Sequence, residues 1–328
     1  MVSMNILSER PVFAVDGEVF HWGDVVRHAR SSGRWDELEA LACQGLACEV
    51  HFETIEEEGA EEAIEEAAAE FRYERELITA EEMEAWLDAR GLTPEEWMGY
   101  IRRTVLRQLW ADDLDDIAAE HPVGDGQVEE ALRIDLLCSG TQRILAEELA
   151  VEAAAAAARG EASPAGPPAD REGRLAALRE QAGRFRQDAM APETLAREIQ
   201  SNQMEWMRVD CRAIAFAGEG PAREAALCLR EDGLEIEEVA GEADVPIREV
   251  ALYLDQLDPE QHSRFLGAAV DDVIGPMPVD DGFTVYQVVA KVMPSIEDPE
   301  IARRAEKGVL TRLLAAEVNR RVRWHADF

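Results

Sequence analysis

A proline-rich break near the middle of the chain constrains the possible fold more than any other feature. The alanine run that ends at residue 158 can stay helical, but Pro164, Gly166, Pro167 and Pro168 cannot continue a helix. Helical periodicity dominates before this break, and period-two strands enter after it. The 328 residues therefore predict two modest domains, each large enough to bury a core.

The part before the break, residues 1–158, predicts a short hairpin followed by a helical bundle. The hairpin is expected to turn at Asp16-Gly17. Thr79 and Thr93 are each followed three residues later by glutamate, a pattern that marks two helix starts. Asp125 is expected to begin one long helix that carries leucines as far as Leu149.

The part after the break predicts a linker, a connector and a small mixed domain. We expect a flexible linker over 159–173 and a helical connector over 174–203. Residues 204–294 alternate strand, helix and hairpin patterns, which indicates an α+β domain. In the last region, 295–328, the stretch from Asp298 to Trp324 predicts a single helix that returns to the N-terminal bundle.

Charge narrows the possible partners. The chain has 69 acidic and 33 basic residues, a formal net charge of −36, which disfavours nucleic acid and membrane surfaces and favours a basic partner. The N-terminus lacks a secretory pattern, and no apolar run reaches the length of a membrane span. The five cysteines form no CxxC pair, so we expect reduced thiols and a cytoplasmic protein.

Metal and cofactor motifs are weak in this sequence. Cys43, Cys48 and His51 could be drawn as a zinc trio, but their spacing does not place them on one helix face, and no fourth ligand follows. The phosphate-loop and dinucleotide fingerprints do not occur. The sequence therefore predicts no metal and no cofactor.

Several stretches after residue 204 resemble a parvulin (PpiC-type) domain. They are RAIAF (212–216), IEEVA (236–240), LDPEQ (257–261), DDVIGPM (271–277) and GFTVYQV (282–288). The whole layout resembles SurA-like chaperones, and most nearly the parvulin-related proteins of peptide maturation systems. The resemblance implies an α+β fold: a helical chaperone-like bundle, a small parvulin-like domain and a C-terminal helix that packs back on the bundle.

The resemblance also implies a site, and this chain departs from it. The two family histidines fall on Ala213 and Thr284, and the wall phenylalanine falls on Gln261. The wall methionine becomes Leu257. These changes predict that the catalytic positions are degenerate while a peptide groove persists. The residues expected to bind peptide are Leu257, Met277, Phe283, Ile214, Trp86 and Trp97.

These features favour a non-catalytic, chaperone-like protein that binds a peptide or an unfolded chain. By resemblance, the client is a precursor peptide presented to a modifying enzyme. Two alternatives remain open at this point: a prolyl cis-trans isomerase with an altered site, and an acidic scaffold for a modifying enzyme. Trp86 and Trp97 could line a peptide groove, although tryptophans at helical spacing more often belong to a core.

Overall fold

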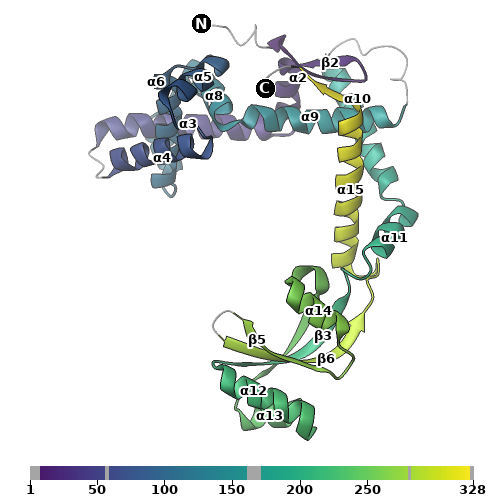
Figure 1. Ribbon diagram of the computed structural model, residues 1–328. Helices are drawn as coiled ribbons and strands as arrows, with labels where there is room; N and C mark the ends of the chain where they lie inside the picture. The colour runs from purple at the N-terminus through teal and green to yellow at the C-terminus, as the bar shows by residue number, and fades with distance from the viewer. Residues whose placement is uncertain (1–7, 56–58, 161–170, 280–281, 326–328) are drawn as a thin grey trace. The chain divides into compact units, whose positions relative to one another are not determined.

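The computed structural model describes all residues except 1–7, 56–58, 161–170, 280–281 and 326–328 (Figure 1). It confirms the predicted α+β class, with a helical bundle and small antiparallel sheets. The chain divides into two compact units. Unit 1 holds the described residues up to Phe185 together with those from Leu314 onward, and unit 2 spans Arg186–Leu313.

Unit 1 consists of a three-stranded sheet and a set of helices. The sheet has the order β2-β1-β7, with both pairings antiparallel. Its strands are β1 (Pro11–Val15), β2 (Glu18–His21) and β7 (Val322–Trp324). Its helices are α2 (Trp22–Ser31), α3 (Arg34–Thr54), α4 (Ala60–Glu74), α5 (Ala80–Arg90), α6 (Pro94–Leu109), α7 (Leu114–Glu120), α8 (Asp125–Ser139), α9 (Thr141–Ala158) and most of α10 (Arg171–Ala189).

Local sequence signals set several of these boundaries as predicted. Asp16 and Gly17 take φ values of 50° and 91°, as a tight two-residue hairpin turn requires. Thr93 Oγ1 accepts the Glu96 amide at 3.2 Å, and Glu96 Oε2 accepts the Thr93 amide at 2.7 Å. Thr79 and Glu82 form the same reciprocal pair. These capping boxes satisfy backbone amides that a helix start leaves free.

The prediction of one long helix from Asp125 to Leu149 is wrong. The helix ends at Ser139, and α9 begins at Thr141 after Gly140 takes a φ of 76°. A side chain is strained in that left-handed conformation, whereas glycine adopts it freely. The single glycine therefore changes the chain direction and separates the leucines of α8 from those of α9.

The C-terminal segment completes the core of unit 1, but not as one helix up to Trp324. Helix α15 (Pro299–Arg321) ends at Arg321, and β7 then pairs with β1 in the register Phe13 with Trp324. Val322 is buried in the same cluster as Phe13 and Phe20. Trp324 stays partly exposed and packs its ring against Phe13, with centroids 5.4 Å apart.

The linker predicted over 159–173 is described only in part. Residues 161–170 lie outside the described part of the chain, and α10 already begins at Arg171. The connector predicted over 174–203 consists of α10 and α11 (Pro192–Ser201). Pro192 occupies the first turn of α11, where its missing amide removes no hydrogen bond.

Unit 2 contains a four-stranded antiparallel sheet with the order β4-β3-β6-β5. Its strands are β3 (Arg208–Phe216), β4 (Ile247–Tyr253), β5 (Val273–Val279) and β6 (Gly282–Val292). Its helical segments are α11, α12 (Glu219–Leu227), η1 (Cys228–Asp232), α13 (Ile236–Glu242), η2 (Leu254–Gln256), α14 (Pro259–Gly267) and the first part of α15. The order of strand, helices, strand, helix and hairpin agrees with the α+β pattern predicted for residues 204–294.

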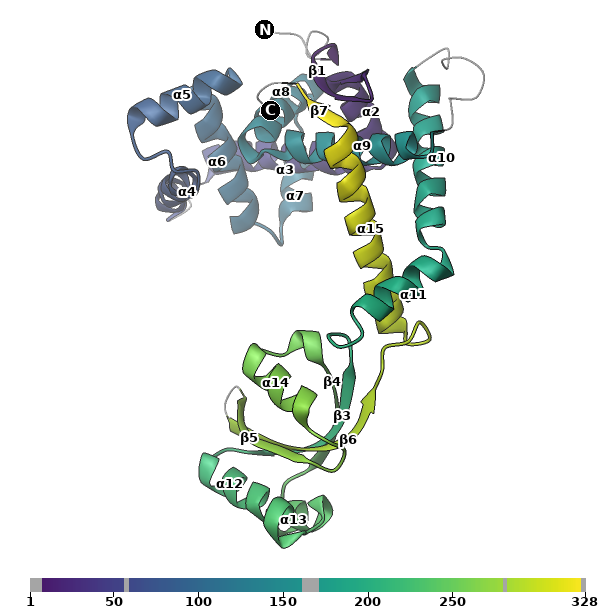
Figure 2. The ribbon, with the colours of Figure 1, turned by 45° about the vertical axis from the view of Figure 1, so that its right-hand side comes forward.

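The two faces of this sheet bury different helices (Figure 2). On one face, Ile214, Phe216 and Val285 pack with residues of α12 and α13. On the other face, Val209, Cys211 and Val288 pack with Phe265 of α14. We call this second face, which carries Ala213, Ala215, Thr284 and Tyr286, the site face.

Asp24 is a buried carboxylate whose protonation is expected to govern the acid stability of unit 1. It is 0% exposed, accepts the His21 amide at 2.9 Å and lies 3.0 Å from Arg174 Nη2 and 3.3 Å from Arg27 Nη2. Burial alone would raise its pKa, but the His21 amide and the two guanidinium groups outweigh burial and lower it. The stabilisation is therefore present above the unfolded pKa of about 3.9 and is lost as the pH falls through the folded value.

Replacing Asp24 with asparagine should lower the free energy of unfolding at pH 7 by about 2–3 kcal/mol, because charge-assisted hydrogen bonds are lost. The gap between variant and parent should begin to narrow below about pH 4 and should close once the pH is below the lowered folded pKa, where the parent carboxylate is also neutral. Urea titrations at both pH values measure this difference. An equal difference in unfolding free energy at pH 7 and at the acid pH would show that the charge of Asp24 does not stabilise unit 1.

In the described part of the chain, no helix is both long and apolar enough to cross a bilayer.

Candidate peptide-binding site

The site face is organised as rows of residues that lie opposite one another across the strands. Ala213 lies opposite Arg248 of β4 and Tyr286 of β6. In the next row, Thr284 lies opposite Ala215 on one side and Met277 on the other. Residues directly opposite in antiparallel strands share a face, so Ala213 and Thr284 stand in adjacent rows of one surface.

Helix α14 and the segment before it form one wall of this surface. Leu257 packs against the cluster that contains Met277 and Phe265. Asp258 caps the helix by accepting the Gln261 amide at 2.9 Å. Gln261 lies one helical turn before Phe265, which is 1% exposed against the sheet, so its side chain is on the same helix face. Helical periodicity therefore places Gln261 on the side of α14 that faces the sheet surface carrying Ala213 and Thr284.

The Cys211 thiol and the Tyr286 hydroxyl, two polar groups in the rows of the site face, are held in their neutral forms. Burial and the neighbouring Asp210 carboxylate raise the pKa of the Cys211 thiol to about 12, so no thiolate forms at neutral pH. Burial also raises the pKa of Tyr286 and outweighs the hydrogen bond with Thr284. The Tyr286 ring packs edge-on against Phe265, with centroids 5.4 Å apart. These groups can donate and accept hydrogen bonds, but they cannot exchange protons with a substrate near pH 7.

Helix α14 also carries His262, which is half-buried and directly follows Gln261. His262 lies four residues before Leu266, which packs against the core cluster of the site face. An imidazole can act as an acid or a base near neutral pH. This residue therefore gives the isomerase alternative a specific group to test.

A cleft of about 570 Å³ opens between α14 and β5. Its volume lies within the range of sites that hold a small ligand or a few residues of a peptide. We call it the α14 cleft. It is lined by Arg230, Arg264, Gly267, Ala268, Asp272, Val273, Ile274 and Gly275. Ile274 lies opposite Tyr286, so the cleft continues the row that starts at Arg248.

The outer edge of β5 is capped by a side chain. Arg230 of η1 donates from Nε to the Val273 carbonyl at 3.1 Å, and its Nη2 donates to the Gly275 carbonyl. An added peptide strand would need such carbonyl groups for its own ladder. The capping favours binding in the cleft over addition of a strand at this edge.

Two of the residues expected to bind peptide lie on the wrong face. Ile214 is 0% exposed and packs under α12 and α13, and Phe283 is half-buried in the same cluster. Side chains alternate along a strand, so neighbours of Ala213 and Thr284 must point to the opposite face. Both residues belong to the core of unit 2. Met277 and Leu257, by contrast, lie on the site face.

The two tryptophans predicted for a groove form part of an aromatic core in unit 1. Trp97 is 8% exposed and lies 5.7 Å from Phe71, centroid to centroid. Trp86 packs edge-on against Phe71 at 5.4 Å, and Arg90 covers its ring at 4.1 Å. The buried Trp97 therefore cannot line a groove, and the ring of Trp86 is engaged on both sides.

Sequence reasoning missed Tyr286, Ala215 and Arg248. Tyr286 and Ala215 lie two residues from positions that were already assigned to the site, so period-two alternation would have found both. Arg248 required the register between β3 and β4, which joins residues far apart in the sequence. Sequence spacing alone does not contain that register.

No family model and no curated protein matches this chain. Among solved structures, it is similar to PrsA from Bacillus subtilis, with 15% identity over 66% of this chain and 79% of that chain and a TM-score of 0.22. It is also similar to a SurA-like chaperone of Campylobacter jejuni, with 8% identity over 97% of this chain and 99% of that chain and a TM-score of 0.20.

Proposed function

We propose that this protein is a chaperone-like module that binds extended polypeptide on the site face of unit 2 without isomerising it. The observation that carries the proposal is the composition of that face. It retains apolar walls, including Leu257 and Met277, beside the α14 cleft. The groups at its centre are Ala213, Thr284 and Tyr286, and none of them is an acid or base near pH 7.

Binding a peptide requires fewer specialised groups on the site face than isomerising it does. Isomerisation must lower a barrier of about 18–20 kcal/mol by stabilising a twisted amide. Holding a peptide requires only apolar contact and hydrogen bonds with the extended chain. The hydroxyl groups of Thr284 and Tyr286 can supply such hydrogen bonds in their neutral forms.

A more specific proposal names the client peptide, the cellular compartment and a partner enzyme. By the resemblance to parvulin-related proteins of peptide maturation, the client is a precursor peptide, the setting is the cytoplasm, and a modifying enzyme is a further partner. The net charge of −36 favours clients and partners with basic segments. Basic peptides should therefore bind more tightly than acidic ones of equal length, and the difference should shrink at high salt.

Ala215→Trp should obstruct the site face without disturbing the core. Ala215 is exposed and lies opposite Thr284, so a large ring at this position would cover the row between Thr284 and Met277. We expect at least a tenfold loss of affinity, about 1.4 kcal/mol, for a fluorescent peptide or an unfolded, carboxymethylated client protein. Fluorescence anisotropy measures the affinity.

Ala251→Trp provides the matched control. Ala251 is exposed on β4 next to Val250, whose partner Cys211 lies on the site face, so Ala251 points to the opposite face. Its replacement should leave the affinity unchanged. No measurable binding to any extended peptide, or equal losses in the two variants, would refute the proposed site.

A turnover assay separates holding from isomerising. Proline-containing tetrapeptides should isomerise at the uncatalysed rate in the presence of the protein. Catalysis that disappears in the His262→Asn or Leu257→Ala variant would establish the enzyme alternative instead.

A further inference from the structure

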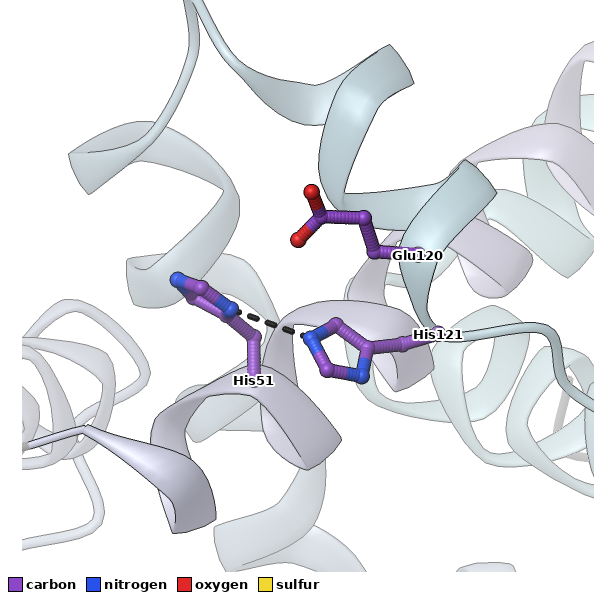
Figure 3. A group of neighbouring side chains, drawn as sticks. All are labelled: His51, Glu120 and His121. Carbon is purple, nitrogen blue, oxygen red and sulfur yellow. Dashed lines mark hydrogen bonds between the residues drawn. The ribbon is translucent and has the colours of Figure 1, made fainter.

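Three potential metal ligands meet in unit 1, at a place that the peptide-binding proposal does not use. His51 lies in the last turn of α3, Glu120 is the last residue of α7, and His121 follows directly. One ligand atom from each residue lies within 4.8 Å of the others. Figure 3 shows the two imidazole rings approaching each other, with the Glu120 carboxylate turned toward the same region.

The two imidazoles stand at a distance that suits a shared metal ion. His51 Nδ1 and His121 Nε2 are 3.1 Å apart. Two nitrogens bound to one tetrahedral Zn²⁺, at about 2.0–2.1 Å each, are separated by roughly 3.3–3.4 Å. A metal ion could therefore replace the hydrogen between the rings with a shift of only a few tenths of an ångström.

The surrounding residues hold the ligands in place. The His51 ring meets the Trp110 ring edge-on, with centroids 5.0 Å apart at an interplanar angle of 86°. The His121 amide donates to the Ile117 carbonyl at 2.9 Å, which fixes the end of α7. Ile117 and Cys48 are buried in the core beneath, together with Leu106. A site held on packed elements loses little conformational freedom when it binds an ion.

The donor set also indicates the class of ion. Two imidazoles and one carboxylate are ligands for Zn²⁺ and similar first-row divalent ions, and a site with three protein ligands leaves a fourth position for water. The trio of Cys43, Cys48 and His51 that the sequence offered is not the group that meets here. Burial raises the pKa of the Cys48 thiol to about 11, so Cys48 is a neutral core residue at pH 7.

We propose that His51, Glu120 and His121 bind a divalent transition-metal ion of the Zn²⁺ class, which clips the end of α3 to the end of α7. Sequence spacing does not indicate this site, because 70 residues separate the two histidines. Only the Glu120-His121 pair is local. The expectation of no metal was drawn from spacing within single helices, whereas this site joins two helices.

The test uses the full chain, freed of metal with EDTA and dialysed. Calorimetric titration with ZnCl₂ should give one site per chain. His51→Asn and His121→Asn should each weaken Zn²⁺ binding at least tenfold. Loss of a residue that only hydrogen-bonds a metal ligand already lowers metal affinity by about 10–100-fold. His262→Asn, a histidine of unit 2, is the matched control and should leave the affinity unchanged.

Two further measurements keep the result decisive. Co²⁺ in place of Zn²⁺ should give the intense visible d–d absorption of a four-coordinate ion, and this absorption should be lost in both histidine variants. Glu120 is exposed, so Glu120→Gln should keep the fold and still weaken Zn²⁺ binding. Thermal melts in EDTA should be unchanged for this variant.

The proposal is overturned if the parent chain binds Zn²⁺ no more tightly than the His51→Asn/His121→Asn double variant. That outcome would assign all binding to the acidic surface. Equal affinity in the parent chain and in Glu120→Gln would also remove the carboxylate from the site.

Discussion

Replacing Arg103 with methionine is expected to lower the free energy of unfolding of unit 1 by about 3–5 kcal/mol. Arg103 is 5% exposed and lies 2.6 Å from Asp135 of α8 and 3.5 Å from Glu49 of α3. Methionine fills similar space but leaves both carboxylates without their cation. Breaking a buried pair on one side is costly because a desolvated charge remains.

Two glycines leave space for the Arg103 side chain. A Cβ atom at Gly45 would lie 3.0 Å from Arg103 Cβ, and one at Gly99 would lie 3.1 Å from Nη1. Burial raises the pKa of Glu49 even though Arg103 is close, so this carboxylate depends on the guanidinium to remain charged. Two glycines and two carboxylates thus converge on one side chain.

Arg34→Met is the matched control for Arg103→Met. Arg34 pairs with Glu37 on the surface at 3.2 Å, and both side chains are about half exposed or more. An exposed pair contributes about 0–1 kcal/mol, so this variant should unfold close to the parent. Urea titrations monitored by far-ultraviolet circular dichroism measure both. Similar losses in the two variants would show that the buried position carries no special weight.

Gly282→Ala is expected to destabilise unit 2 by roughly 3 kcal/mol, because the new methyl group collides with backbone. A Cβ atom at Gly282 would overlap the Phe216 carbonyl oxygen, and a backbone carbonyl of a paired strand cannot rotate away as a side chain can. Phe216 pairs with Phe283 at this end of the sheet. The glycine is therefore required for β6 to approach β3.

Gly241→Ala, by contrast, is expected to raise the free energy of unfolding. Gly241 lies in α13, and a Cβ atom added there meets nothing within 4 Å. Alanine in a helix is more stable than glycine by about 0.5–1 kcal/mol, so this variant should gain stability up to that amount. Thermal and urea unfolding of the two variants provide the comparison. A tolerated Gly282→Ala would mean that the β3–β6 contact is looser than described.

Features set by neighbouring residues were predictable from the sequence. The capping boxes at Thr79 and Thr93 and the hairpin turn at Asp16-Gly17 formed as expected. Each depends on a hydrogen bond or a φ angle within a few residues, so the local pattern contains the information. The α+β class followed from the same periodicities.

Features that depend on which distant elements meet were not predictable. The placement of Ile214 and Phe283 is not such a case, because strand alternation around Ala213 and Thr284 already puts them on the other face. The register of β3 with β4, which brings Arg248 beside Ala213, and the meeting of His51 with His121 arise from packing alone. A single sequence shows which residues are available for such contacts, but it does not show which distant residues meet.

The pairing of β7 with β1 has a consequence for the order of events during synthesis. Val12 and Phe13 of β1 are fully buried, and the neighbour that β1 gains on one side comes from residues 322–324, which are made only after the whole of unit 2. The nascent chain therefore carries an open, apolar strand edge until β7 has been made and has emerged from the ribosome.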